Sequence, residues 1–210
     1  MDTSGRTVAT LPLEGGHLAL DFVNTVGGLR VQPPSPAEEL LDDYVDLTIW
    51  WARVGVISER QAASLRAAAK RDSRGAQRAL QSAKELRDEL VYPIFRAIAD
   101  GEEPPRELLD RLRDHECRGL RDAQLGRGWS WPPPKELTDP LRPIVHAAVE
   151  LLTAGPLDRI KTCGNCRWLF IDQSRNHSRR WCSMEECGIQ MKHARFVERR
   201  RSRTTRAEPA

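Results

Sequence analysis

Hydrophobic side chains recur at helical spacing along most of the chain. This spacing predicts four successive helices, at about residues 36–54, 59–71, 73–100 and 105–118. A fifth helix is predicted from residue 141 to the Gly155–Pro156 pair, which would end it. Ser35 and Ser58 stand where the first two helices need an N-cap, and Gln61 would complete a capping box with Ser58. Pro93 should kink the third helix, because proline cannot donate a helical hydrogen bond.

Two shorter stretches alternate between apolar and polar positions, which is the period of a β-strand. In residues 17–23, Leu18, Leu20 and Phe22 fall on one side, and the second stretch covers residues 129–131. We expect these two strands to pair as a small antiparallel sheet. Residues 1–14 show neither pattern and are expected to be disordered. The prediction is an α+β fold, in which residues 15–156 form a mostly helical domain with a small antiparallel sheet.

Four of the five cysteines follow this domain with the spacing C-x2-C-x15-C-x4-C: Cys163, Cys166, Cys182 and Cys187. Two cysteines two residues apart form a knuckle that points both sulfurs at one ion, and a second pair completes a tetrahedral site of the kind that zinc prefers. The residues between the pairs predict a β-hairpin, with strands at 167–172 and 178–182. Ser183 would cap the next helix together with Glu186. The sequence therefore predicts a small treble-clef-like zinc finger that binds Zn²⁺, made of a hairpin and a helix, over residues 159–206.

Other chemistry is open to these cysteines. A redox dithiol at Cys163 and Cys166 would need a strand-to-helix turn, whereas the flanking residues predict a hairpin. A rubredoxin-like iron site has a compatible spacing. A catalytic zinc needs an open coordination position, and four cysteines leave none unless one dissociates. We expect a cytoplasmic protein, because the N-terminus lacks the pattern of a secretory signal, and thiols in that compartment stay reduced.

Charge is distributed unevenly along the chain. Residues 1–158 contain 20 Lys and Arg against 25 Asp and Glu, whereas residues 159–206 contain 13 basic and 4 acidic residues. On the helix after Cys187, five basic side chains fall within an arc of about 80°: Lys192, Arg195, Arg199, Arg203 and Arg206. Ile189, Phe196 and Val197 lie beside this arc and are expected to pack on the hairpin.

A one-sided basic helix has the dimensions of an element that enters the major groove or follows the phosphate backbone. Double-stranded DNA is therefore the partner that we expect, and Arg179 and Arg180 of the hairpin would extend the same surface. A solvated basic tail, or a module that binds an acidic protein, would carry the same charge. RNA would be favoured if Trp168 or Trp181 stacked on bases, although both are also placed to pack across the hairpin.

The stretch CGNCRWLFIDQSRNHSRRWCSMEECG resembles the zinc finger of the CGNR family, and GGHLALDFVNTV resembles the opening of the ABATE domain. The two stretches occur in the family's order. The resemblance implies a bacterial, stress-related transcription regulator of the one-component type. In such a protein the four cysteines bind zinc, the C-terminal helix binds DNA, and the N-terminal domain senses a small ligand or forms a homodimer. One departure is clear: the family is named after Cys-Gly-Asn-Arg at the fourth ligand, where this chain has Cys187, Gly188, Ile189 and Gln190.

Polar residues gather around the first predicted strand. Asp21, Asn24 and Arg30 are the candidates for lining a ligand pocket, although Asp21 and Asn24 are also suited to capping turns. Trp129 and Trp131 would supply an aromatic wall. The chain has no paired nucleophile and base, no glycine-rich phosphate loop and no His-Glu-x-x-His motif, so we expect no enzyme activity. No apolar stretch approaches the roughly 20 residues that span a bilayer, so we expect no membrane partner. The expected DNA partner would place the protein on the nucleoid.

Overall fold

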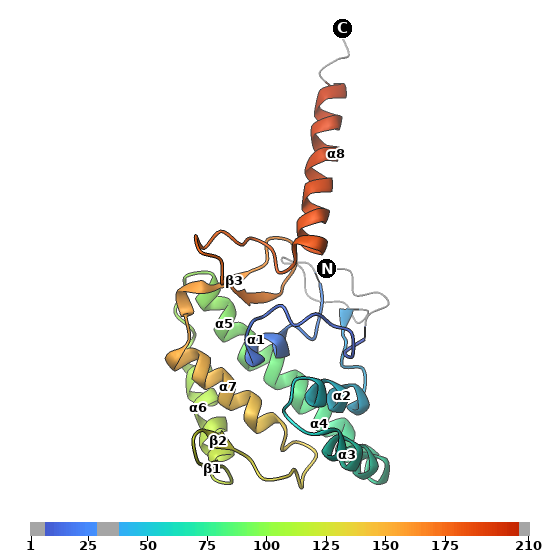
Figure 1. Cartoon of the computed structure of the whole chain (residues 1–210), viewed down its shortest axis with the longest axis vertical. Coiled ribbons are helices and arrows are strands. Elements are labelled where there is room, and N and C mark those ends of the chain that lie inside the picture. The colour runs from blue at the N-terminus through green and yellow to red at the C-terminus, as the bar shows by residue number, and fades with distance from the viewer. Residues whose placement is uncertain (1–6, 29–37, 206–210) are drawn as a thin grey trace.

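The computed structural model describes residues 7–28 and 38–205, with side chains up to Arg199. Most of this chain is helical, which confirms the predicted α+β class (Figure 1). The helices are α1 Leu18–Val23, α2 Tyr44–Arg53, α3 Glu59–Arg71, α4 Ser73–Glu85, the π-helical turn η2 Leu86–Val91, α5 Tyr92–Ala99, α6 Arg106–Leu120, α7 Leu141–Ala154, the 3₁₀ turn η3 Leu157–Arg159, the π-helical turn η4 Met184–Gly188 and α8 Ile189–Thr205. Two antiparallel strand pairs accompany them, β1 Gln124–Leu125 with β2 Trp129–Ser130, and β3 Ile160–Thr162 with β4 Leu169–Ile171. None of the described helices is long and apolar enough to cross a membrane.

Capping side chains decide where α2 and α3 begin. Helix α3 starts at the predicted capping box, in which Ser58 and Gln61 exchange hydrogen bonds with each other's backbone N–H. The predicted start of α2 near residue 36 is wrong. Asp43 is the N-cap instead, because its carboxylate accepts hydrogen bonds from the backbone N–H of Val45 at 2.7 Å and of Asp46 at 3.0 Å. Ser35 lies outside the described residues.

The third predicted helix changes its winding just before Pro93. Helix α4 passes into η2, where the Tyr92 N–H donates to the carbonyl of Arg87, and α5 follows. Proline has no N–H to donate, so a backbone carbonyl of the preceding turn loses its usual α-helical partner. In a π-helical turn the carbonyl instead accepts from the N–H five residues later. Gly101, with φ 78°, stands just beyond the end of α5, where the left-handed backbone favours glycine.

Residues 18–23 form helix α1, so the predicted strand at 17–23 is wrong. His17 caps the helix by accepting a hydrogen bond from the Ala19 N–H through Nδ1, at 3.3 Å. Five of the six residues of α1 are buried, so the helix has no polar face. In such an element the alternation of residue types does not report which side chains face solvent. Strand β2 pairs with β1 instead, and the predicted pairing of 129–131 with 17–23 does not occur.

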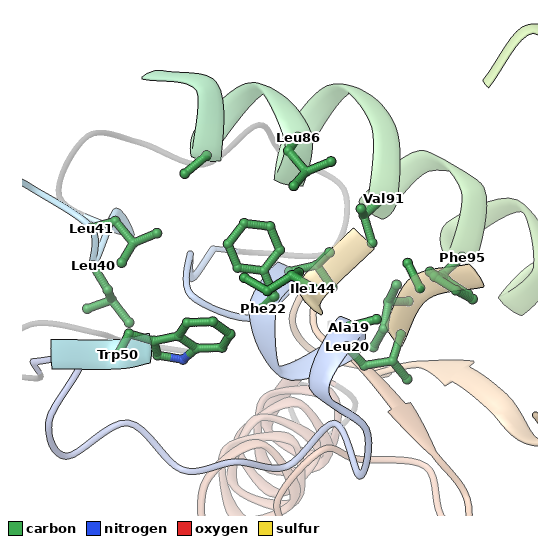
Figure 2. Close-up of a cluster of buried hydrophobic side chains, with 14 of the residues drawn as sticks. Ala19, Leu20, Phe22, Leu40, Leu41, Trp50, Leu86, Val91, Phe95 and Ile144 are labelled. Atoms are coloured by element: carbon green, nitrogen blue, oxygen red, sulfur yellow. The ribbon is translucent and has the colours of Figure 1, made fainter. Parts of the chain in front are cut away.

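Helix α1 lies at the centre of the hydrophobic core. Figure 2 shows Phe22 between Leu86 of η2 and Trp50 of α2, and the rings of Phe22 and Trp50 are 5.4 Å apart between centroids. Residues 7–14 were expected to be disordered, but the structure places them against this core, with Val8 and Leu11 fully buried. The four cysteines of the C-terminal module belong to the same continuous cluster of buried side chains.

The segment around α1 completes the outer edge of β4. One edge of β4 pairs with β3, and on the other edge the alternate backbone N–H groups point outward. Each of them donates to the N-terminal segment: Arg167 to the Gly28 carbonyl at 3.2 Å, Leu169 to Asn24 Oδ1 at 3.0 Å, and Ile171 to the Gly15 carbonyl at 2.9 Å. Asn24 Nδ2 also donates to the Leu169 carbonyl at 2.9 Å. We call this contact, between residues 15–28 and 167–171, the β4 clamp.

A buried arginine supports the clamp from the body. The Arg87 side chain is 1% exposed and forms two hydrogen bonds with the Glu39 carboxylate, at 2.8 and 2.6 Å. It also donates to Thr25 Oγ1 at 3.1 Å. Burial opposes ionisation of Glu39, but the bonds from Arg87 outweigh it and lower the pKa of that carboxyl group. Because Thr25 follows Asn24 directly, this ion pair fixes the backbone from which Asn24 reaches β4.

Candidate zinc centre and nucleic-acid interface

The first cysteine pair lies in the turn of the β3–β4 hairpin. Cys163 and Cys166 flank this turn, and the Cys163 N–H donates to the Trp168 carbonyl at 2.9 Å. A side chain at Gly164 would collide with the protein, since a Cβ there would lie 2.5 Å from the Trp181 ring. The knuckle therefore needs glycine at this position, where the Trp181 ring packs against the turn.

The second pair arrives by a different route from the predicted one. Residues 178–182 were expected to return as a strand beside 167–172, and this prediction is wrong. Both edges of β4 are already occupied, one by β3 and the other by the clamp, so no edge remains for a returning strand. The segment crosses the knuckle instead, where the Gly164 N–H donates to the Arg180 carbonyl at 2.9 Å. Cys182 follows this contact, and Cys187 lies in η4.

The four thiols have the geometry of a zinc site. Their sulfur atoms all lie within 4.8 Å of one another, and the Cys182 sulfur is 3.6 Å from those of both Cys166 and Cys187. A tetrahedral ion with Zn–S bonds of about 2.3 Å requires sulfurs about 3.8 Å apart, close to these distances. All four cysteines are fully buried. The site therefore binds zinc through four protein ligands and leaves no open coordination position, which is the pattern of a structural zinc.

Helix α8 leaves the zinc centre in a fixed direction. The expected capping box does not form, because no side-chain hydrogen bond caps η4 at Ser183. The Trp181 ring holds the junction instead, and a Cβ on Gly188 would lie 3.2 Å from it. Asn165 Nδ2 donates to Gln190 Oε1 at 2.8 Å, which joins the knuckle to the first turn of α8. Gln190, which stands where the family has arginine, therefore takes part in orienting the helix.

Beyond this junction, α8 projects away from the rest of the described chain (Figure 1). Lys192, Arg195 and Arg199 are exposed on it, as expected for a binding face. Arg203 lies in α8 without a described side chain, and Arg206 lies outside the described residues. The prediction that Ile189 and Phe196 pack on the hairpin is wrong, since they are 56% and 58% exposed. Val197, the third side chain of this prediction, is half-buried.

The two hairpin arginines differ in their surroundings. Arg179 uses its donors inside the protein: Nε bonds the Trp181 carbonyl at 3.0 Å, while a terminal nitrogen bonds the Cys182 carbonyl and Glu14 Oε2, the latter at 2.7 Å. Its guanidinium also lies 4.5 Å from the centre of the Phe170 ring. The structure thus places Arg179 in the scaffold of the zinc centre. Arg180 is exposed, with its guanidinium 5.7 Å from the centre of the Trp181 ring.

The two tryptophans of the zinc module do not form a stacking platform for bases. Trp168 is fully buried, and its indole N–H donates to the Val26 carbonyl at 2.9 Å. Trp181 is half-buried between the knuckle and η4. They do not face each other across a hairpin, because the predicted hairpin is absent. The feature that favoured RNA in the sequence therefore has no counterpart in the structure.

Two candidate ligand residues of the N-terminal segment have structural partners. Asp21 is buried and accepts a hydrogen bond from the Gly15 N–H at 2.8 Å. Burial raises the pKa of Asp21 to about 6, against the opposing effect of that hydrogen bond. Asn24 is fully engaged in the β4 clamp. Arg30 lies outside the described residues. The sequence did not reveal that Asn24 joins the body to the zinc module, or that Asp21 holds Gly15, whose carbonyl accepts from Ile171 of β4.

A further polar centre of the module was also missed. Asp172 is fully buried next to β4, and its carboxylate accepts hydrogen bonds from Lys161 Nζ at 2.6 Å and from the N–H groups of Ser174 at 2.9 Å and Arg179 at 3.0 Å. Burial would raise the pKa of Asp172, but these donors outweigh it and hold the pKa well below its usual range. An aspartate at a strand end before a polar loop was the available signal in the sequence.

Comparison with protein families gives two adjacent matches. Residues 16–155 match ABATE, described as "Putative stress-induced transcription regulator". Residues 159–200 match the CGNR zinc finger. Both agree with the resemblance drawn from the sequence. No curated protein matches the chain at a significant level.

Proposed function

The chain belongs to the ABATE family, and on that premise we propose that it is a one-component transcription regulator that binds double-stranded DNA through α8. The zinc centre fixes the start of this helix, and its basic face meets the duplex. The proposal places the protein on the nucleoid in the cytoplasm and includes no enzymatic activity.

The observation that carries the proposal is the free-standing basic helix. Lys192, Arg195 and Arg199 are exposed on one face of a helix that extends well beyond the module (Figure 1). Its 17 residues span about 25 Å at a rise of 1.5 Å per residue. An isolated helix of this length is marginal in water, so a partner that packs along it would stabilise it. The major groove of DNA, about 12 Å wide, admits such a helix.

The exposed apolar side chains of α8 suit the same partner. Phe196 lies next to the basic face on the helical projection, one turn beyond Lys192. Apolar side chains in the major groove contact thymine methyl groups, while neighbouring arginines bind phosphates or guanine. A second copy of α8 is a poor alternative partner, because two helices of this charge would repel each other.

The ligand-sensing part of the proposal rests on a cavity in the body. A cavity of about 290 Å³ is lined by apolar residues that include Leu18, Val54, Val56 and Trp131, together with four prolines. The charged groups in its wall, Asp139 and Arg142, are paired with each other at 3.0 Å. Such a site favours a small uncharged molecule. Trp131 thus lines a candidate site, whereas Asp21 and Asn24 do not. A homodimer stays a prediction.

Duplex binding at several salt concentrations tests the proposal. The variant R195A/R199A should lower the slope of log affinity against log salt by about two, since each phosphate contact contributes close to one. The matched control is R74A/R78A, which removes two exposed arginines of α4, far from the zinc centre. Equal affinity of wild type and R195A/R199A for the duplex would overturn the proposal. If the basic face binds an acidic protein and DNA does not compete for it, a protein-interaction module replaces the DNA-binding proposal.

A further inference from the structure

The loop between β4 and η4, residues 173–180, lies at the edge of the module from which α8 departs (Figure 1). It contains no acidic residue. Its exposed side chains are Gln173, Arg175, Asn176, His177, Ser178 and Arg180. Among the described residues, no acidic side chain pairs with Arg175 or Arg180. These are the side-chain types that bind phosphate and sugar groups of nucleic acids.

Hydrogen bonds within the protein hold this loop near both of its ends. The Asp172 carboxylate binds both ends, through the N–H groups of Ser174 and Arg179. Ser174 Oγ accepts from the Ser178 N–H at 2.9 Å, which closes the loop on itself. These hydrogen bonds restrict the backbone of the loop and also connect it to the scaffold of the zinc centre. A loop that binds a partner gains affinity, because less conformational entropy is lost on binding.

Two basic residues that precede β4, Arg159 of η3 and Lys161 of β3, hold the backbone of the loop through hydrogen bonds. Lys161 Nζ donates to the carbonyls of His177 and Arg179, in addition to its ion pair with Asp172. Arg159 donates to the carbonyls of Asp172 at 3.1 Å and Ser174 at 3.4 Å. The backbone carbonyls of the loop therefore turn inward, toward these cations, and the side chains at the loop tip turn outward.

His177 shows that the loop conformation is imposed by these contacts. Its φ of 49° lies in the left-handed region, and no other described residue except glycine has a positive φ. A side chain in this region costs free energy and persists only where the surroundings determine the backbone. The bond from Lys161 to the His177 carbonyl is such a determinant. Residues held in this way are more frequent at binding sites than elsewhere.

The loop and α8 are joined at their bases. The Arg180 carbonyl accepts from the Gly164 N–H of the knuckle, and the next residue, Trp181, packs against Gly164 and Gly188. Gly188 immediately precedes α8. The knuckle therefore connects the end of the loop to the start of α8, and a duplex bound along α8 would lie near the neighbouring surface of the module.

We infer that loop 173–180 is a second contact to the duplex, in which Arg175 and Arg180 bind backbone phosphates next to the groove occupied by α8. The inference rests on the proposed function. It assigns sequence-independent affinity and orientation to the loop, because phosphate contacts position a protein on DNA without reading bases.

Duplex binding by R175A/R180A tests the inference. Both residues are exposed, so the variant should keep the zinc content and melting temperature of wild type. Its slope of log affinity against log salt should fall by about two, or close to one for each arginine. The charge-preserving variant R175K/R180K should restore the slope, and R74A/R78A should leave it unchanged.

The outcomes separate this inference from the proposed function. A reduced slope in both R195A/R199A and R175A/R180A supports two contacts. A reduced slope in R195A/R199A alone overturns the loop contact and leaves the α8 proposal standing. An equal reduction in R74A/R78A would show an effect of net charge and would overturn both the loop contact and the α8 contact. No salt-dependent duplex binding by wild type overturns both.

Discussion

Replacing Asn24 by alanine should separate the zinc module from the body more effectively than any change of similar size elsewhere in the clamp. The Asn24 amide bonds both backbone groups of Leu169, accepting from the N–H at 3.0 Å and donating to the carbonyl at 2.9 Å. Asn24 is 1% and Leu169 is 0% exposed, so water cannot replace these bonds without opening the contact. In N24A, one donor and one acceptor of β4 lose their partners.

The expected magnitude follows from the burial of these two groups. A buried polar group left without a partner costs about 1–3 kcal/mol, so two groups give about 2–6 kcal/mol of lost stability. Native domains unfold with a free energy of roughly 5–15 kcal/mol, and the loss is therefore a large fraction of the total. N24D should be at least as damaging, because it keeps an acceptor for the Leu169 N–H but places a carboxylate oxygen against the Leu169 carbonyl.

Urea unfolding of zinc-loaded protein, followed by tryptophan fluorescence and circular dichroism, measures this loss. The matched control is N176A, which removes an exposed asparagine of loop 173–180 and should change stability by less than about 0.5 kcal/mol. Zinc release to a chelator should be faster in N24A than in N176A, since the clamp supports the hairpin that carries the knuckle. A loss below about 1 kcal/mol in N24A would refute the reasoning.

Three other changes have defined outcomes. Burial raises the pKa of Asp21 to about 6, so the folded state holds a proton that the unfolded chain has lost, and stability falls as pH rises. The stability of D21N relative to wild type should therefore increase by about 1.4 kcal/mol from pH 5 to pH 8, and a constant difference would contradict this assignment. C182S should lose zinc, whereas C117S, which changes the exposed cysteine of α6, should retain about one zinc per chain in elemental analysis. R179K keeps the charge but loses the fork of donors to Trp181 and Cys182, so it should release zinc faster while its salt slope for DNA stays that of wild type. A changed salt slope with normal zinc retention would indicate that Arg179 contacts DNA rather than supporting the zinc centre.

The sequence predicted best those features that depend on residues close together in the chain. The capping box of Ser58 and Gln61 formed as expected, because a cap and its partner lie within one turn. The cysteine spacing was equally informative, since a knuckle of two cysteines leaves few other metal geometries. The helical stripes predicted most helices for the same reason, with errors at their ends.

The failures have a common cause in contacts between distant segments. The pattern at residues 178–182 predicts a returning strand. The edge of β4 that such a strand needs is occupied by Gly15, Asn24 and Gly28, which lie about 145 residues earlier in the chain. The sequence of α1 predicts a strand because the helix is buried on nearly every side. It therefore has no exposed polar face, and helical periodicity can be recognised only where such a face exists. Neither contact leaves a trace in local periodicity.

Through the β4 clamp, helix α1 contacts both the cavity of the body and the zinc module. Leu18, in the first turn of α1, lines the cavity of the body, and Asn24, the C-cap residue of α1, holds the edge of β4. A ligand in that cavity can change the zinc module only if its contacts differ between two positions of α1, because a ligand shifts an equilibrium by no more than its differential affinity. The hydrogen bonds of Asn24 are the contacts that would distinguish those positions. A ligand that acts on DNA binding through the body must therefore lose its effect in N24A, whereas one that acts directly on α8 must keep it.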